Sequence, residues 1–571
     1  MEDYDPATTP GGPTAPLTPA VRALMQERLD AYLERMAAVR PASHADKGTV
    51  FAGSGGRALL LLKLHAATAN ASFLAAANGY VGAMEARLPR QRASDAAAGF
   101  VGFQWSHVGM LCVGAVAAQA NGDDAKADGY AAQVAAAVAS RAGRYDDFDS
   151  GRAGLLYAVR FLEANLKPRT AEVTTAEATT TEPETAEATA VATTVEATTT
   201  TTTMPAGAAE GSAKRAAVPT PRVPRADVLN LALEIIDRGA ATAAAHGAPG
   251  ILLWHGPNDG GLWLGQSHGA SGVLQQLLAV PELVADHPHR HSHPPSPPPP
   301  PPVTTPSLTT APPSPIQVAL VRPDNPRGNA TARALLTATF EHIVTSQLPS
   351  GNFPTEYYNA TQDYLVQWDH GAPGVSAALL AAADAFGDAR YAAAAARALE
   401  CTWRRGLVLK GLMNCHGIGG TASSKRRLGG ATAGHQRLMR VHLKTLGCST
   451  HSGGGAQHLR LHRACLTLKR SHAEDAGFAA LGHPGGNTWM QLHAARATRN
   501  ATYLYRALAF QRLVLQTPLL SDLASMRQPQ PLPDGPWQFW TGSVESAIEL
   551  WTDLLYRGPA NASETGWEAR L

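Results

Sequence analysis

Short glycine turns recur along this chain, and an apolar stretch follows each of them at once. Stretches 57–66 (RALLLLKLHA), 153–166 (AGLLYAVRFLEANL) and 375–386 (VSAALLAAADAF) carry apolar residues at i, i+3 and i+4 spacing, whereas strand-like alternation is scarce. The seven turns are residues 53–56 (GSGG), 106–109 (SHVG), 151–154 (GRAG), 269–272 (GASG), 371–374 (GAPG), 417–420 (GIGG) and a degenerate copy at 542–545 (GSVE). This pattern predicts an all-α fold.

The turns lie about 45 to 65 residues apart once three atypical segments are subtracted, which is the length of a helical hairpin repeat. Glycine lets the backbone turn sharply and lets the next helix approach its neighbours closely. A single hairpin cannot bury its apolar face, so the hairpins should close on themselves. We therefore predict an α/α toroid of about seven helical hairpins, with the turns at one end of an inner ring. The alternative is an irregular bundle in which these glycines are ordinary helix C-caps.

The predicted toroid spans residues 18–557, between a disordered N-terminus (1–17) and a C-terminal tail (558–571). The segment 167–225 is rich in Thr, Ala, Glu and Pro, with too few large apolar side chains to offset the entropy of ordering. The segment 286–315 is a His/Pro tract that favours an extended spacer. The basic, Gly- and His-rich segment 421–484 is interpreted as an insertion, either a lineage-specific loop or a translated intron.

Composition excludes several classes of function. A formal charge of +2 over 571 residues gives no basic face for nucleic acid. The N-terminus has no apolar signal region, and no stretch reaches roughly 18 uninterrupted apolar residues, so we expect a cytoplasmic protein without a membrane span. Five unevenly spaced cysteines indicate thiol or metal chemistry rather than disulfides; they are Cys112, Cys401, Cys415, Cys448 and Cys465, the last two inside segment 421–484.

Four turns carry more than glycine: residues 254–256 (WHG), 267–269 (SHG), 368–374 (WDHGAPG) and 414–417 (NCHG). In a toroid, such turns meet around one mouth although they are remote in sequence. Asp369, Cys415 and His416 could then supply three zinc ligands and leave the fourth position open, as in catalytic zinc sites.

Four blocks in order resemble the eukaryotic lanthionine synthetase C-like family: residues 148–159 (FDSGRAGLLYAV), 264–278 (LGQSHGASGVLQQLL), 350–375 (SGNFPTEYYNATQDYLVQWDHGAPGV) and 409–420 (LKGLMNCHGIGG). The resemblance implies an α-toroid and a zinc ion held by two Cys and one His. It also implies that the metal lowers the pKa of a thiol, which then adds to a dehydrated serine or threonine. Bacterial relatives cyclise peptides, while eukaryotic relatives bind glutathione and are considered to add it to dehydroamino acids in proteins.

Cys415 and His416 match the family's Cys-His ligand pair, whereas Asp369 stands where the first Cys ligand is expected. A carboxylate can bind zinc and brings the same negative charge as a thiolate, but a harder ligand should change the zinc affinity and admit other divalent ions. His370 could replace Asp369 if the turn rotates, although it matches the family's His after the Cys and is more simply a residue that supports the ligands.

Three further residues take roles from the resemblance. His268 occupies the position of the family's general acid/base histidine, a role that suits a side chain titrating near neutrality; the alternative is a buried histidine that caps a helix. Lys410 matches a lysine associated with glutathione, or is simply exposed. Asp147 lies where bacterial members hold a catalytic Asp, which the eukaryotic pattern does not require.

The first functional hypothesis is a zinc-dependent enzyme that adds glutathione or a similar thiol to an electrophilic alkene in a polypeptide. The second is a catalytically weakened glutathione-binding or signalling scaffold with the same fold, for which peripheral association with the plasma membrane is compatible with the family. A third, a toroidal glycosidase, needs paired acids. Apart from Asp369 and Asp147, the glycine turns do not offer such acids.

Overall fold

The computed structural model describes residues 5, 9, 11–38, 48–51, 53–167, 222–257, 260–284, 326–406, 485–516, 548 and 550–557. Within these residues the regular structure is helical, apart from an isolated antiparallel bridge between Trp263 and Glu356. The prediction of an all-α fold is therefore confirmed.

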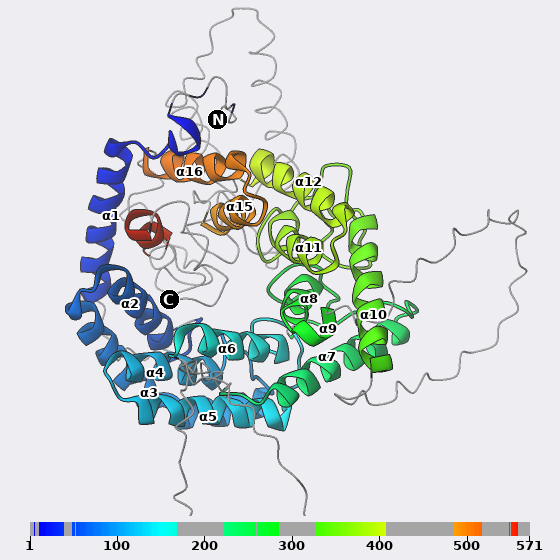
Figure 1. Cartoon of the computed structure of the whole chain (residues 1–571), viewed down its shortest axis with the longest axis horizontal. Coiled ribbons are helices and arrows are strands. Elements are labelled where there is room, and N and C mark those ends of the chain that lie inside the picture. The colour runs from blue at the N-terminus through cyan, green and yellow to red at the C-terminus, as the bar shows by residue number, and fades with distance from the viewer. Residues whose placement is uncertain are drawn as a thin grey trace, which may run out of the picture.

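The helices form two concentric rings (Figure 1). The inner ring contains α2 (Ser54–Thr68), α4 (His107–Ala120), α6 (Arg152–Asn165), α8 (Ala270–Leu278), α11 (Ala372–Phe386) and α15 (Gly485–Thr498). The outer ring contains α1 (Pro19–Ala38), α3 (Ala71–Ala98), α5 (Asp124–Ser140), α7 (Arg225–Ala245), α10 (Pro326–Thr345), α12 (Ala389–Arg405) and α16 (Ala501–Gln516). Three short elements complete the described part: η1 (Gly12–Thr14), α9 (Pro281–Val284) and η2 (Asp553–Arg557). This arrangement is the predicted α/α toroid.

The inner helices contact one another in chain order, from α2 through α4, α6, α8 and α11 to α15. A buried cation joins the two ends of the series. Lys63 in α2 places its Nζ 3.0 Å from Oδ2 of Asp553 in η2 and 5.4 Å from the ring centroid of Trp489 in α15. The first and last parts of the ring therefore meet at Lys63.

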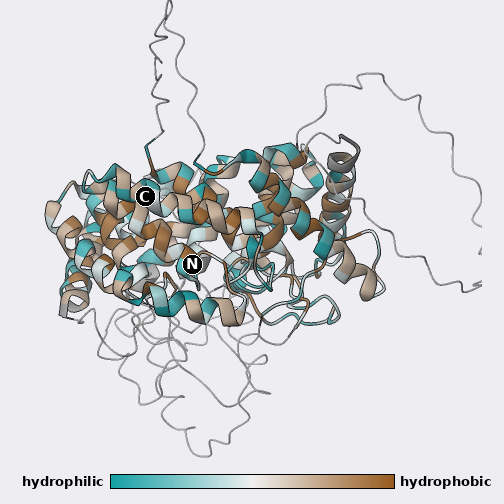
Figure 2. Ribbon diagram, turned by 90° about the horizontal axis from the view of Figure 1, so that it is seen from below, coloured by the Kyte–Doolittle hydropathy of each residue, from teal (hydrophilic) through white to brown (hydrophobic). Residues whose placement is uncertain are grey.

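The inner and outer helices differ in how much of their surface is buried. Every residue of α4 from 108 to 119 is buried, because an inner helix has neighbours on all sides. In α5 the buried residues are a stripe of Ala127, Ala131, Val134 and Val138, since an outer helix packs on one face only. Seen from its side, the ring carries hydrophobic and hydrophilic residues along the same helices (Figure 2). Both rings thus contribute to the core, the outer helices with one face only.

A glycine at the third position of four inner helices lets the preceding turn fold back onto the helix. A Cβ on any of them would lie far inside the 3.0 Å that real Cβ contacts observe. The distances to the carbonyl oxygen six residues upstream are 1.8 Å for Gly109 and Phe103, 2.2 Å for Gly154 and Phe148, 1.8 Å for Gly272 and Gln266, and 2.0 Å for Gly374 and Trp368. These glycines stand at helix N-termini, so the alternative that they are C-caps is wrong for the described turns.

The remaining organisational predictions lie largely outside the described residues. These are segments 286–315 and 421–484, almost all of 167–225, the tail 558–571, and the turns at 417–420 and 542–545. Within the described part of the chain, no helix is both long and apolar enough to cross a membrane.

Candidate functional site

Backbone contacts join successive glycine turns around one end of the ring, which we call the turn end. The amide of Gly102 donates to Ser150 O at 2.8 Å, and the amide of Phe148 donates to Ser267 O at 3.1 Å. The next contact is between Gly265 and Asp369, where a Cβ on the glycine would lie 1.6 Å from the Asp369 carbonyl oxygen. Turns separated by about 50 to 120 residues of sequence therefore lie side by side, as the sequence predicts.

His268 stands among acidic side chains at this end. Its Nδ1 lies 3.3 Å from Oδ2 of Asp147, and its Nε2 lies 3.7 Å from Oδ2 of Asp149. Asp149 in turn accepts a hydrogen bond from the Ser267 hydroxyl. The His268 side chain is 16% exposed whereas both carboxylates are 1% exposed, so the imidazole is the member of the cluster that solvent reaches. Its Nδ1 faces a carboxylate, and the N-cap of α8 is Gly269, so His268 does not act as a helix-capping histidine.

The pKa values of His268 and Asp149 are both raised, although burial and charge act in opposite ways on the two groups. Burial alone would lower the pKa of His268, but the hydrogen bond to Asp147 and the charges of Asp149, Asp369 and Asp147 outweigh it and raise the pKa to about 10. Burial also raises the pKa of Asp149 to about 7; the charge of His268 opposes this rise, and the charges of Asp369 and Asp147 add to it. His268 is thus an imidazolium at neutral pH, with a proton on each ring nitrogen.

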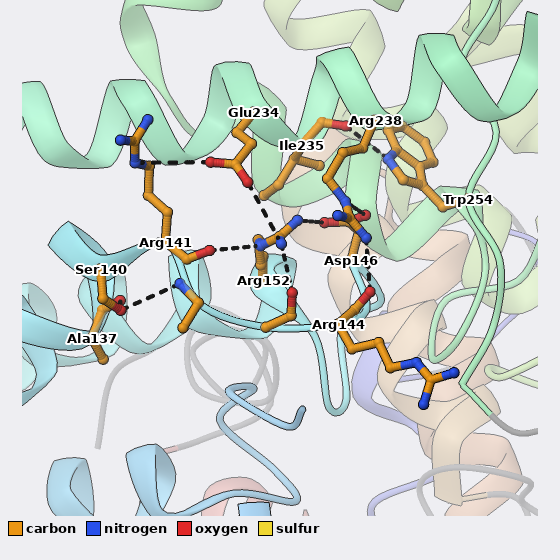
Figure 3. A network of polar contacts seen from close by, with 12 residues as sticks. Ala137, Ser140, Arg141, Arg144, Asp146, Arg152, Glu234, Ile235, Arg238 and Trp254 are labelled. Carbon is orange, nitrogen blue, oxygen red and sulfur yellow. Dashed lines mark hydrogen bonds and ion pairs between the residues drawn. The ribbon is translucent and has the colours of Figure 1, made fainter. Parts of the chain in front are cut away.

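A network behind the cluster fixes the turn that carries Asp147 (Figure 3). Arg152 donates to Asp146 Oδ1 at 2.8 Å and to the backbone oxygen of Gly143 at 2.5 Å. Arg238 from α7 donates to Asp146 Oδ2 at 2.9 Å. Asp147 itself accepts from the backbone amide of Ser150 at 2.9 Å and from its hydroxyl. Ser150 therefore holds the carboxylate that faces His268, while the two arginines hold the neighbouring Asp146.

Asp369 and His370 form the opposite part of the site. Asp369 is buried, and its Oδ2 lies 3.1 Å from Nε2 of His370. The ring of Trp263 lies 4.5 Å from that of His370 and 6.0 Å from that of His268, measured between centroids. Trp263 thus forms an aromatic wall between the two histidines.

Of the three predicted metal ligands, Asp369 is the one that the structure describes. A carboxylate is a zinc donor, so Asp369 suits the role by its chemistry and by its place at the turn end. Within the part of the chain that the structure describes, no three His, Cys, Asp or Glu side chains are grouped as a metal site. Cys415, His416 and Lys410 lie outside the described residues.

The two described cysteines are free, buried thiols remote from this chemistry. Burial raises the pKa of Cys112 above its ordinary value and that of Cys401 to about 11. Both are thus protonated and unreactive at neutral pH.

Comparison with known proteins settles the family. The sequence model described as "Lanthionine synthetase C-like protein" matches residues 44–216 and 314–451, more than half of the chain. The chain belongs to the lanthionine synthetase C-like family. Asp369 and the predicted ligands Cys415 and His416 lie inside the second matched segment, whereas His268 lies between the two.

One relative is "Glutathione S-transferase LANCL1" of Danio rerio. It is 35% identical to this lanthionine synthetase C-like chain over 109 residues, which cover 19% of this chain and 27% of the relative. The chain therefore matches about a quarter of the length of that protein.

Two residues of the site were missed by the sequence analysis. Asp149 follows Asp147 by two positions in the run DDFDSG, and that acidic spacing was the available signal. Asp149 also supplies a further acid at the turn end beyond those the sequence offered. Trp263 gave no signal, because its place beside His268 and His370 depends on the toroid's closure.

Proposed function

We propose that this lanthionine synthetase C-like protein adds a thiol of the glutathione type to dehydroamino acid residues in polypeptides. The observation that carries the proposal is the imidazole of His268, which lies 3.3 Å from the Asp147 carboxylate and is partly exposed at the turn end. The hydrogen bond to Asp147 and the charges of Asp149, Asp369 and Asp147 raise its pKa to about 10. Family membership and the name of the Danio rerio relative support a glutathione-related activity.

The reaction is a conjugate addition in which His268 acts as the general acid. The thiolate sulfur attacks Cβ of the dehydroamino acid, a C–S bond forms, and the π electrons move to Cα and its carbonyl. His268 then delivers its Nε2 proton to Cα, and the proton lost by the thiol restores the imidazolium through solvent. Asp147 keeps the other ring nitrogen, Nδ1, protonated and the ring oriented, as a carboxylate partner does for a catalytic histidine.

Asp369, Cys415 and His416 would hold a zinc ion, and Lys410 would pair with a glutathione carboxylate. When bound, the ion would supply a lowered pKa for the attacking thiol. The charge of Asp369 also helps to keep His268 protonated, because it is among the causes that raise the pKa of that imidazole.

Mass spectrometry tests the proposal. The full chain, loaded with zinc, is incubated with glutathione and a dehydroalanine peptide, and the peptide mass is followed. We expect a time-dependent glutathione adduct that falls by about 10²- to 10⁴-fold in rate for His268→Asn. His65→Gln is the control, since His65 lies in the last turn of α2, where its Nδ1 bonds the backbone carbonyl of Asn70. Equal rates for the wild type and His268→Asn would refute the role of His268.

A glutathione-binding or signalling scaffold is the second candidate, and one observation favours it. Asp369 stands where the family has a cysteine ligand, and its carboxylate already lies 3.1 Å from Nε2 of His370. The affinity of the proposed site for zinc could therefore be reduced. In that case glutathione would bind the chain, but no adduct would form above the uncatalysed rate.

A further inference from the structure

Two exposed histidines face each other at the end of α7, outside the site described above. His246 is the C-cap of α7, and His255 lies in the segment that follows. Their Nε2 atoms are 3.3 Å apart, and their ring centroids are separated by 5.1 Å at an interplanar angle of 63°. Two imidazole tips therefore converge on one point at the surface.

This separation matches that of two nitrogens on one tetrahedral metal ion. Imidazole nitrogens bind zinc at about 2.0 to 2.1 Å, and a tetrahedral angle then places them about 3.3 to 3.4 Å apart. An ion could therefore bridge the two Nε2 atoms of His246 and His255 at their present separation.

A backbone contact sets the tautomer of His255. Its Nδ1 lies 2.6 Å from the carbonyl oxygen of Gly260, and a carbonyl can only accept a hydrogen bond. Nδ1 therefore carries the hydrogen, and Nε2 presents its lone pair toward His246. A metal-binding histidine is oriented in the same way, because its second ring nitrogen donates to a carbonyl or carboxylate.

The position of His246 favours a cation. The free carbonyls at the C-terminus of a helix carry partial negative charge, and α7 spans 21 residues, Arg225–Ala245. The hydroxyl of Tyr358 donates to the backbone oxygen of His246 at 3.1 Å, which fixes this residue from another segment.

We propose that His246 and His255 form a surface site for a late first-row divalent ion such as Zn²⁺, with solvent in the remaining positions. Ions late in the Irving–Williams order suit paired imidazoles, so Cu²⁺ should bind more tightly than Zn²⁺, and Mg²⁺ should not compete. The proposal does not rest on the thiol-addition activity, because it shares no residue with the proposed ligands Asp369, Cys415 and His416.

Equilibrium dialysis of the full untagged chain against Zn²⁺ tests the proposal. The wild type and the double variant His246→Gln/His255→Gln are stripped with a chelator and compared, with the His/Pro tract 286–315 present in both. We expect the double variant to bind about one equivalent less, and each single variant to bind that equivalent at least tenfold more weakly. His65→Gln is the matched control, because its Nδ1 also bonds a backbone carbonyl, that of Asn70, at 3.0 Å.

An Asp369→Ala variant separates this site from the proposed zinc-ligand set. The equivalent assigned to the histidine pair should remain in it, and X-ray absorption should show nitrogen neighbours at about 2.0 to 2.1 Å. Identical zinc binding by the wild type and the double variant would overturn the proposal, leaving a hydrogen bond between two imidazoles. The proposal would also be overturned if Asp369→Ala lost the zinc equivalent that the double variant loses.

Discussion

The imidazole Nδ1 of His268 lies 3.3 Å from Oδ2 of Asp147, although 121 residues separate them in the sequence. The contact forms because Phe148 donates a backbone hydrogen bond to Ser267, which places the two turns side by side. The ring closure of the toroid, rather than local sequence, therefore builds the acid–base pair.

Replacing Asp147 by Asn should show whether Asp147 orients and charges His268 or only stabilises the fold. The variant keeps an oxygen that can accept from Nδ1 but removes the charge, so the pKa of His268 should fall from about 10 toward its ordinary value of 6.5. The alkaline limit of thiol-addition activity should move to lower pH together with a loss of rate, as a pH–rate profile would show. A lower rate with an unchanged pH profile would contradict this account.

The raised pKa of His268 also makes folding stability depend on pH. The folded state binds the proton more tightly than the unfolded state, so the stabilisation is fully present below pH 6.5 and is lost as pH rises toward 10. Urea unfolding of the wild type and His268→Gln at pH 6, 8 and 10 measures this. The difference in their free energies of unfolding should shrink as pH rises, whereas a constant difference would exclude the ion-pair explanation.

Gly374→Ala should destabilise the ring. The added Cβ would lie 2.0 Å from the Trp368 carbonyl oxygen and 2.8 Å from Cβ of Gln266, so the backbone must shift. We expect a loss of at least about 1–3 kcal/mol in thermal or urea unfolding. In Gly79→Ala, at an open position inside α3, the same change should stabilise the protein by roughly 0.5–1 kcal/mol. Equal effects at both positions would contradict the role of Gly374.

Sequence alone could predict the toroid because its main signal is local. Each turn needs glycine where the chain folds back on itself, and an inner helix such as α4 is buried almost all round. The sequence also predicted that the turns of His268 and Asp369 converge. For Asp149 the only signal was its spacing from Asp147, and Trp263 gave none, because their contacts depend on the packing of one turn against the next.

The buried pair of Lys63 and Asp553 should hold the last described helical segment against α2. Lys63→Met leaves a buried carboxylate without its cation, which typically costs about 3–5 kcal/mol of stability. The double variant Lys63→Met/Asp553→Leu should recover most of this loss, because no buried charge remains. Chemical denaturation of the three proteins gives the comparison, and an unaffected Lys63→Met variant would show that the pair does not close the ring.

The ligand at position 369 should set the zinc affinity. If Asp369, Cys415 and His416 hold the ion, Asp369→Ala should lower the zinc content and Asp369→Cys should raise the affinity, since zinc favours thiolate over a harder oxygen donor. Metal analysis after dialysis against graded chelator concentrations provides the measurement. Equal zinc retention in all three proteins would place the ion elsewhere.

The central claim is that this lanthionine synthetase C-like protein catalyses thiol addition rather than only binding the thiol. The number of dehydroalanine peptide molecules converted to glutathione adduct per protein molecule tests it most directly, with glutathione binding measured on the same sample. We predict many conversions per protein molecule, and few for His268→Asn at unchanged glutathione affinity. Glutathione binding without any conversion above the protein-free rate would contradict the claim and support the scaffold.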